Sequence, residues 1–152
     1  MAAVIDDFSR IIYFENLPNK KAKTVAEFFI RAIKDFEKKW IKIKRLLSDN
    51  GKEFTTHRPN WKKNHVFERI LQMYGIKHYC TRPHRPQTNW KIERFWRTFK
   101  EMFFWKNHFC SFHDFKEKSR DWLFRYNYKK PHSWIWGLSP MEKLFEYKIY
   151  FK

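Results

Sequence analysis

Apolar residues recur at helical spacing between residues 25 and 40. The apolar positions 25, 28, 29, 33, 36 and 40 fall on one helical face, and Lys and Arg side chains lie opposite. Thr24 and Glu27 stand three residues apart at the start of this stretch, as in a capping box. The pattern predicts an amphipathic helix that turns one apolar face, from Val25 to Trp40, toward a core.

Four later stretches also predict helices. Gly75 follows an apolar stretch and suits the left-handed residue that ends many helices. Ser111 with Asp114 predicts the capped start of another helix, and Pro140 suits the first position of the last one. The four predicted helices cover about 66–74, about 89–104, a segment from about 112, and a segment from 140.

Short runs of β-type residues alternate with these helices. Residues 3–14 contain two apolar or aromatic runs around a polar turn, which predicts a hairpin. Residues 41–47 and 76–81 predict two further strands, and the two prolines within 82–88 predict a loop. Alternating strands and helices indicate an α/β fold with a mixed β-sheet flanked by helices.

Charge and composition narrow the class of partner. The chain has 152 residues, 43% of them hydrophobic, which predicts one folded domain over 1–152 rather than a disordered tail. Its formal net charge of +17 predicts attraction to phosphate polymers, with a merely solvated basic surface as the alternative. No apolar run reaches the ~18 residues that span a bilayer. Two cysteines without a Cys-x-x-Cys pair suit a reducing compartment, so we expect a cytoplasmic protein with no membrane partner.

Two acidic residues occupy distinctive settings. Asp49 lies in residues 48–54, Ser-Asp-Asn-Gly-Lys-Glu-Phe, at the end of a predicted strand. Glu93 lies in residues 89–95, Asn-Trp-Lys-Ile-Glu-Arg-Phe, in the first turn of a predicted helix. Carboxylate oxygens of this kind suit Mg²⁺ or Mn²⁺. Each residue alone has a structural alternative, because Asp-Asn-Gly is a common turn and Glu93 can pair with Arg97.

Together these segments resemble the second and third acidic positions of the DDE catalytic core of retroviral integrases and insertion-sequence transposases. Residues 81–88, 126–132 and 137–140 resemble further segments of that family in the same order, so the likeness runs over about 4–145. The resemblance implies a ribonuclease H-like fold in which Asp49 and Glu93 are catalytic metal ligands. It also implies DNA integration or transposition, by Mg²⁺- or Mn²⁺-dependent strand cleavage and strand transfer through transesterification.

The resemblance also implies partners and boundaries. DNA, both as transposon ends and as target, is the expected partner, together with a homo-oligomer and an association with the bacterial nucleoid. The catalytic core is expected over about 4–131, with a carboxy-terminal helical extension over about 132–152. A solvated cationic face is the alternative for each basic residue singly. The residues expected to bind DNA are Lys91, Arg94, Arg97, Lys100, Arg82 and Arg85.

The first acidic residue of the family's trio has no match. In the family it lies on a strand a hairpin's length before the segment that resembles residues 6–10, and only five residues precede Asp6. Asp6 or Asp7 acting as that ligand is the alternative. We expect an amino-terminally truncated core that misses its first strand. A catalytically inactive, DNA-binding remnant is the second candidate function.

Glycine is scarce and tryptophan is plentiful, at three and eight residues. Trp90 stands where relatives carry glycine, and Trp134 stands where a small residue is usual. One hypothesis is that both are UGA codons that the source organism reads as glycine, and drift in a decaying mobile element is the alternative. Trp40 and Trp122 fit predicted apolar helical faces and are expected to be genuine. Detection of tryptophan at position 90 by mass spectrometry of the native protein would contradict the hypothesis.

Overall fold

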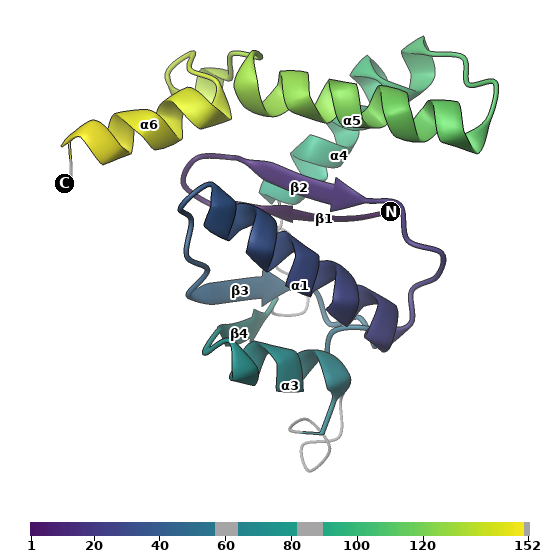
Figure 1. The fold of residues 1–152 in the computed structure, drawn as a ribbon, viewed down its shortest axis with the longest axis vertical. Coiled ribbons are helices and arrows are strands. Elements are labelled where there is room, and N and C mark those ends of the chain that lie inside the picture. The colour runs from purple at the N-terminus through teal and green to yellow at the C-terminus, as the bar shows by residue number, and fades with distance from the viewer. Residues whose placement is uncertain (57–63, 82–89, 151–152) are drawn as a thin grey trace. The chain divides into compact units, whose positions relative to one another are not determined.

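The strands that the structure describes form two separate two-stranded sheets, β1–β2 and β3–β4, rather than one continuous sheet. The structure is a computed structural model that describes residues 1–56, 64–81 and 90–150 (Figure 1). The chain divides into two units. Unit 1 comprises Met1–Val4 and Tyr13–Trp90, and unit 2 comprises Ile5–Ile12 and Lys91–Lys152. The predicted domain boundaries remain a prediction.

The predicted hairpin is confirmed. Its strands are β1 (Ala2–Ile5) and β2 (Ile12–Glu15), and the Asp6 amide donates to the Ile11 carbonyl at 2.9 Å across the turn. The turn ends at Arg10, whose φ of 68° lies in the left-handed region. The polar residues between the two apolar runs therefore form the reversal that their composition predicts.

Strands β3 (Arg45–Ser48) and β4 (Lys77–Cys80) run parallel. The register places Leu46 opposite His78 and Ser48 opposite Cys80, so both strands end at the same edge. The sequence predicted that the first of these strands begins at residue 41. It begins later because the Ile41 amide still donates to Phe36 at the end of the preceding helix, at 2.9 Å.

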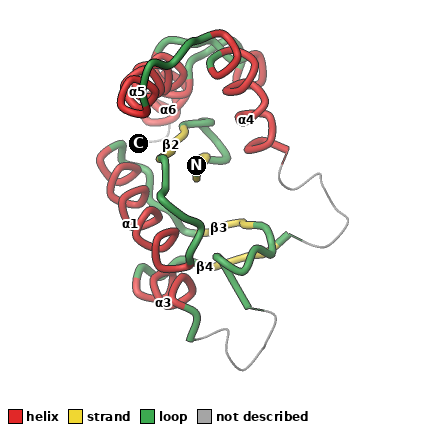
Figure 2. Tube along the Cα trace, turned by 90° about the vertical axis from the view of Figure 1, so that its right-hand side faces the viewer, coloured by secondary structure: helices red, strands yellow, loops and turns green. Residues whose placement is uncertain are grey.

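Helices α1 (Ala22–Lys38) and α3 (Val66–Met73) supply the apolar side of unit 1. The rings of Phe29 and Phe67 lie 5.4 Å apart between the two helices, and Figure 2 shows both helices on the same side of the β3–β4 pair. Burial follows the predicted helical spacing closely. The buried residues of α1 are Val25, Ala26, Phe28, Phe29, Ala32, Ile33 and Phe36.

The predicted capping box at Thr24 is wrong. Helix α1 begins two residues earlier, at Ala22, and its N-cap Lys21 makes no side-chain capping bond. The Asn19 side-chain oxygen instead accepts from the Lys21 amide at 3.0 Å and from the Thr24 hydroxyl at 2.8 Å. The Thr24 hydroxyl is therefore occupied outside the helix backbone, and Glu27 has no cap to complete.

Trp40 does not continue the apolar face of α1, contrary to the sequence prediction. The helix ends at Lys38, and Trp40 follows with a φ of 60° and a side chain that is 67% exposed. The Trp40 amide donates to Glu37 at 2.8 Å, and the following amide donates to Phe36. This bonding resembles a Schellman motif, in which glycine is the usual left-handed residue.

Aromatic packing builds the core of unit 2. It contains α4 (Trp90–Met102, from Lys91 onward), α5 (Phe112–Tyr128) and α6 (Pro140–Tyr150), with short 3₁₀ segments η2 (Phe104–Lys106) and η3 (Ser133–Ile135). The Phe99 side chain is fully buried, and its ring lies 5.1 Å from Trp122 and 5.0 Å from Phe103. Trp122 therefore contributes to the apolar core, as its spacing predicted.

Asn127 connects α5 to the first residue of β2. Its side-chain oxygen accepts from the Ile12 amide at 2.9 Å, and its side-chain nitrogen donates to the Ile12 carbonyl at 2.8 Å. Both partners are buried, so the amide group satisfies two backbone groups that water does not reach.

The predicted starts of α5 and α6 are confirmed. The Asp114 amide donates to the Ser111 hydroxyl at 3.1 Å, and the Glu142 amide donates to the Ser139 hydroxyl at 3.3 Å. Pro140 is the first residue of α6, and Gly75 after α3 has a φ of 65°. No helix in the described part of the chain is both long and apolar enough for a transmembrane span.

Tryptophan occupies a second left-handed position at Trp136, where φ is 63° and the side chain is 87% exposed. Neither Trp90 nor Trp134 is among the described residues with positive φ. The backbone therefore favours glycine at positions 40 and 136, whereas the sequence hypothesis placed recoded glycines at positions 90 and 134.

Candidate functional site

Asp49 lies on a tight turn directly after β3. Its side chain is exposed, and its Oδ1 atom accepts from the Gly51 amide at 2.9 Å. The Asn50 side chain donates to the Thr81 carbonyl at 2.7 Å, and the Thr81 amide donates to the Ser48 carbonyl at 2.9 Å. The turn is therefore fixed at the carboxyl ends of both parallel strands, the edge at which α/β sheets usually bind ligands.

A second carboxylate reaches the same turn. A Cβ atom added at Gly51 would lie 2.6 Å from Glu53 Oε2 and 3.0 Å from Asp49 Oδ1. Both carboxylates therefore converge on the space beside Gly51, where the glycine leaves room for them. The sequence pointed to Glu53 only as part of a motif, and the Asp-Asn-Gly-x-Glu spacing around a turn is the signal that could have identified it.

Glu93 lies in the first turn of α4, near the positive end of the helix dipole. Its side chain is exposed and forms no hydrogen bond or ion pair with the described residues. The structural alternative for this residue, an ion pair with Arg97 four positions later, is therefore not formed in the structure. A carboxylate in this setting is available to an external cation.

An open groove of about 430 Å³ runs beside Glu93 in unit 2. Arg97 and Lys100 follow Glu93 at helical spacing, are exposed, and make no hydrogen bond or ion pair within the described part of the chain. The groove thus combines an acidic residue with two available cations and two indole rings. Its lining residues are Glu93, Trp96, Arg97, Lys100, Glu101 and Trp105.

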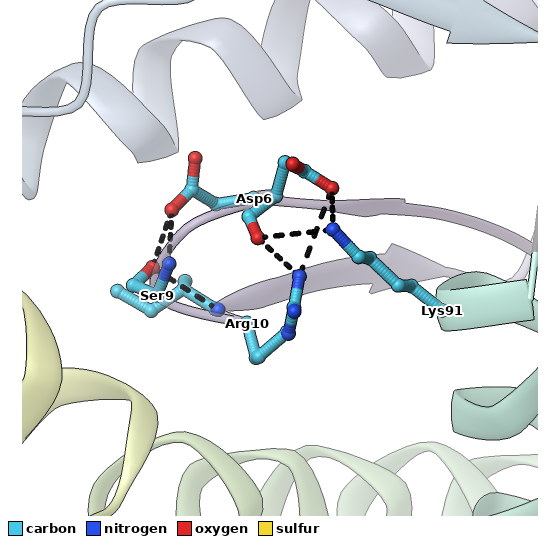
Figure 3. A network of polar contacts seen from close by, with 6 residues as sticks. Asp6, Ser9, Arg10 and Lys91 are labelled. Atoms are coloured by element: carbon cyan, nitrogen blue, oxygen red, sulfur yellow. Dashed lines mark hydrogen bonds and ion pairs between the residues drawn. The ribbon is translucent and has the colours of Figure 1, made fainter. Parts of the chain in front are cut away.

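Lys91 and both acidic residues of the hairpin turn make polar contacts within unit 2, and Figure 3 shows Asp6, Ser9, Arg10 and Lys91. The Lys91 ammonium forms an ion pair with Asp7, which also lies 3.6 Å from the Arg10 guanidinium. Asp6 Oδ2 accepts from the Ser9 amide at 2.7 Å and from the Ser9 hydroxyl at 2.6 Å. The Asp6 carboxylate therefore stabilises its own turn.

Of the other predicted DNA-binding residues, Arg94 is described by the structure, and Arg82 and Arg85 are not. The Arg94 guanidinium lies 4.8 Å from the centre of the Trp134 ring, a cation–π contact. Arg82 and Arg85 lie outside the described residues. The assignment of DNA-binding roles to the six basic residues remains a prediction.

The residues present fit a hard divalent cation in their chemistry. Asp49 and Glu53 bring carboxylates to one space in unit 1, and Glu93 presents an unengaged carboxylate in unit 2. Oxygen ligands of this kind suit Mg²⁺ and Mn²⁺. Within the described residues no three His, Cys, Asp or Glu side chains come together as a complete metal site.

Comparisons with known proteins agree with the sequence motifs. Two family models, both described as integrase core domain, match residues 1–86 and residues 74–140. The presumed integrase ORF3 of Spiroplasma virus SpV1-C74 is 32% identical over 107 residues, which cover 67% of this chain and 30% of that protein. The chain therefore spans less than a third of this relative's length.

Two solved structures, both of viral integrases, are similar to this chain in fold. The catalytic core domain of BIV integrase matches with a TM-score of 0.66 and 22% identity, over 97% of this chain and 86% of that chain. A chain of the simian T-cell lymphotropic virus intasome, in complex with PP2A regulatory subunit B56 gamma, matches with a TM-score of 0.70 and 14% identity. That match covers 93% of this chain and 46% of the other.

These matches confirm the ribonuclease H-like, α/β fold that the sequence predicted. The first family model alone covers more than half of the chain and includes Asp49, and the second includes Glu93. The chain belongs to the integrase core domain family.

Proposed function

We propose that this chain is the catalytic-core part of a DDE transposase that cleaves DNA strands and joins them to target DNA. The observation that carries the proposal is the unengaged Glu93 carboxylate, which shares a groove with the available cations Arg97 and Lys100. Family membership and the position of Asp49 at a strand end support it.

Asp49 and Glu93 would hold Mg²⁺ or Mn²⁺, with Glu53 beside Asp49 as a further oxygen donor. A divalent ion bound there would supply activation of an attacking oxygen and stabilisation of the leaving one. The Gly51 amide orients Asp49 Oδ1, while the α4 backbone sets the direction of Glu93. The protein's own contribution is to hold each carboxylate on a well-defined local element, a turn for Asp49 and a helix for Glu93.

The α4 groove would hold the DNA backbone. Arg97 and Lys100 lie four and seven residues after Glu93, which places them roughly 6 and 10 Å along the helix axis. Successive phosphates of one DNA strand advance about 3.4 Å along the duplex, so both cations can contact phosphates close to Glu93. Such contacts position a strand without reading its sequence.

A nicking assay tests the enzymatic proposal. Wild-type protein should nick supercoiled DNA in Mn²⁺ or Mg²⁺ but not in EDTA, and both Asp49→Asn and Glu93→Gln should reduce nicking to background. Glu101→Gln is the matched control, because Glu101 lines the same groove and has no predicted role as a ligand. Equal nicking by wild type and both ligand variants would refute the proposal.

A second candidate is a non-catalytic protein that binds DNA without cutting it. One observation favours it: Asp6, an alternative for the family's first acidic ligand, already stabilises its own turn. In that case the protein would bind DNA with a steep salt dependence and nick none of it in any metal. Sedimentation of the protein with DNA would also test the expected homo-oligomer.

A further inference from the structure

A buried chain of hydrogen bonds leads from α3, through β4, to the backbone of Asp49. His78 Nδ1 lies 2.9 Å from Glu68 Oε1, and His78 Nε2 lies 2.9 Å from Ser48 Oγ. The Ser48 hydroxyl donates to the Asp49 carbonyl at 2.8 Å. The His78 and Glu68 side chains are only 3% and 8% exposed, so the chain of bonds is shielded from water.

Strand register and helix packing together produce this arrangement. His78 in β4 lies opposite Leu46 in β3, and Ser48 follows two residues after Leu46. The His78 and Ser48 side chains therefore project from the same face of the β3–β4 pair. Helix α3 covers that face, with the Phe67 ring 5.7 Å from the His78 ring. Ser48, His78 and Glu68 therefore come from three elements, β3, β4 and α3, that are separated in sequence.

Glu68 connects both ends of the turn that carries Asp49. Through His78 it reaches Ser48, the residue before Asp49, and it also accepts from the Thr55 hydroxyl at 3.4 Å. The Thr55 amide donates to the Gly51 carbonyl at 3.1 Å. One buried carboxylate thus links the segments immediately before and after the Asp49–Glu53 turn.

The arrangement of Ser48, His78 and Glu68 also resembles a nucleophilic triad, but Ser48 does not suit that role. A nucleophilic hydroxyl has to reach a substrate. Ser48 is only 8% exposed, and its hydroxyl already donates to the next residue's carbonyl. The geometry suits orientation of the turn rather than attack on an external group.

We propose that Glu68 and His78 are positioning residues that hold Ser48 and Thr55 on either side of the Asp49–Glu53 turn, and thereby orient Asp49 for a divalent cation. The inference rests on the proposed function, because Asp49 is its metal ligand there. Outer partners that orient metal ligands typically change metal affinity about 10- to 100-fold when they are removed. Since Glu68 and His78 act through Ser48, we expect an effect near the lower end of that range.

Mn²⁺ binding to the DNA-free protein, measured by electron paramagnetic resonance, tests this role without any activity assay. Ser48→Ala should weaken Mn²⁺ binding about tenfold, whereas Ser48→Thr keeps the hydroxyl and should bind as the wild type does. The double variant E68L/H78F should match Ser48→Ala. It replaces both polar partners with apolar side chains of similar shape, which tends to preserve folding better than removal of one partner.

Tyr13→Phe is the matched control in the same unit. The Tyr13 hydroxyl donates to Glu15, which also pairs with Arg31, so this substitution removes a part-buried hydrogen bond far from Asp49 in sequence. It should leave Mn²⁺ affinity unchanged. Circular dichroism identifies a temperature at which every variant is folded, so that differences in stability do not affect the comparison of Mn²⁺ affinities.

Amide hydrogen exchange adds a readout that needs no metal. The Phe54 and Thr55 amides, both bonded to Gly51, should exchange faster in Ser48→Ala than in wild type or Ser48→Thr. Unchanged Mn²⁺ affinity in folded Ser48→Ala and in the double variant would overturn the positioning role alone. If wild type and Asp49→Asn bind Mn²⁺ equally, or neither binds it, both the positioning role and the proposed function are overturned.

Discussion

The two candidate metal ligands are supported in different ways. Asp49 lies on a turn whose flanks are bonded to buried polar groups, chiefly Ser48 and Glu68. Glu93 lies on a helix whose opposite side is anchored by buried aromatic rings such as Phe99. Hydrogen bonds fix the direction of a backbone segment, whereas apolar packing fixes a whole helix and leaves its exposed side chains free. We therefore expect Asp49 to depend on single polar atoms and Glu93 to depend on core volume.

The largest effect on stability should come from creating a cavity in the aromatic core that packs against α4. Phe99→Ala removes a fully buried ring and should lower the free energy of unfolding by about 3–5 kcal/mol, measured by denaturant titration. Phe112→Ala is the control, because this ring is 62% exposed and should cost less than about 0.5 kcal/mol. Similar losses for both variants would show that aromatic packing does not hold α4.

Both units carry an exposed tryptophan with left-handed backbone, which permits a matched test. Trp40→Gly in unit 1 and Trp136→Gly in unit 2 should each raise the free energy of unfolding by about 1 kcal/mol, because glycine removes the Cβ conflict at positive φ. Alanine at the same positions keeps the Cβ atom and should give little gain. If alanine stabilises as much as glycine, the indole rather than the backbone is the cause.

Sequence reasoning succeeded where a feature depends on neighbouring residues. The hairpin, the cap at Ser111 and the left-handed Gly75 each follow from local turn and cap chemistry. The prediction that Trp40 continues the apolar face of α1 was wrong, because helical spacing does not reveal where a helix ends. The end of α1 is set by backbone bonds to Glu37 and Phe36 that apolar periodicity does not encode.

The candidate site shows the same division. Asp49 and Glu93 were identified from short motifs, but their roles as ligands remain predictions. Ser48, Glu68 and His78 are separated by up to 30 residues and meet only through strand register and helix packing. No local sequence pattern indicates that these three residues come together, so the sequence analysis did not identify them.

His132, a half-buried histidine of unit 2, should make the protein sensitive to acid. Its Nε2 atom is buried and has no hydrogen-bond partner among the described residues. Burial lowers the pKa of His132, and the nearby charges of Lys130 and Arg10 lower it further. The unfolded chain therefore takes up this proton first as pH falls below about 6.5, and stability should fall with it.

Thermal unfolding from pH 7.5 to 5 measures this contribution. Wild-type protein should lose more stability over that range than His132→Gln, because the variant has no imidazole to protonate at this position. The other histidines are present in both proteins, so their contributions largely cancel in the difference. Parallel pH profiles for the two proteins would rule out His132 as a source of acid sensitivity.

The smallest expected effect is on the salt dependence of DNA binding, where Arg97 and Lys100 should differ from Lys91. Arg97→Ala and Lys100→Ala should each reduce the slope of log K against log salt for DNA binding by about 0.7–0.9, because each removes one phosphate contact. Lys91→Ala should change the slope less, since its ammonium already pairs with Asp7. Fluorescence anisotropy with one duplex at several salt concentrations gives these slopes. Equal changes for all three variants would mean that DNA responds to the overall charge of the protein rather than to the α4 groove, and the two available cations would lose their assigned role.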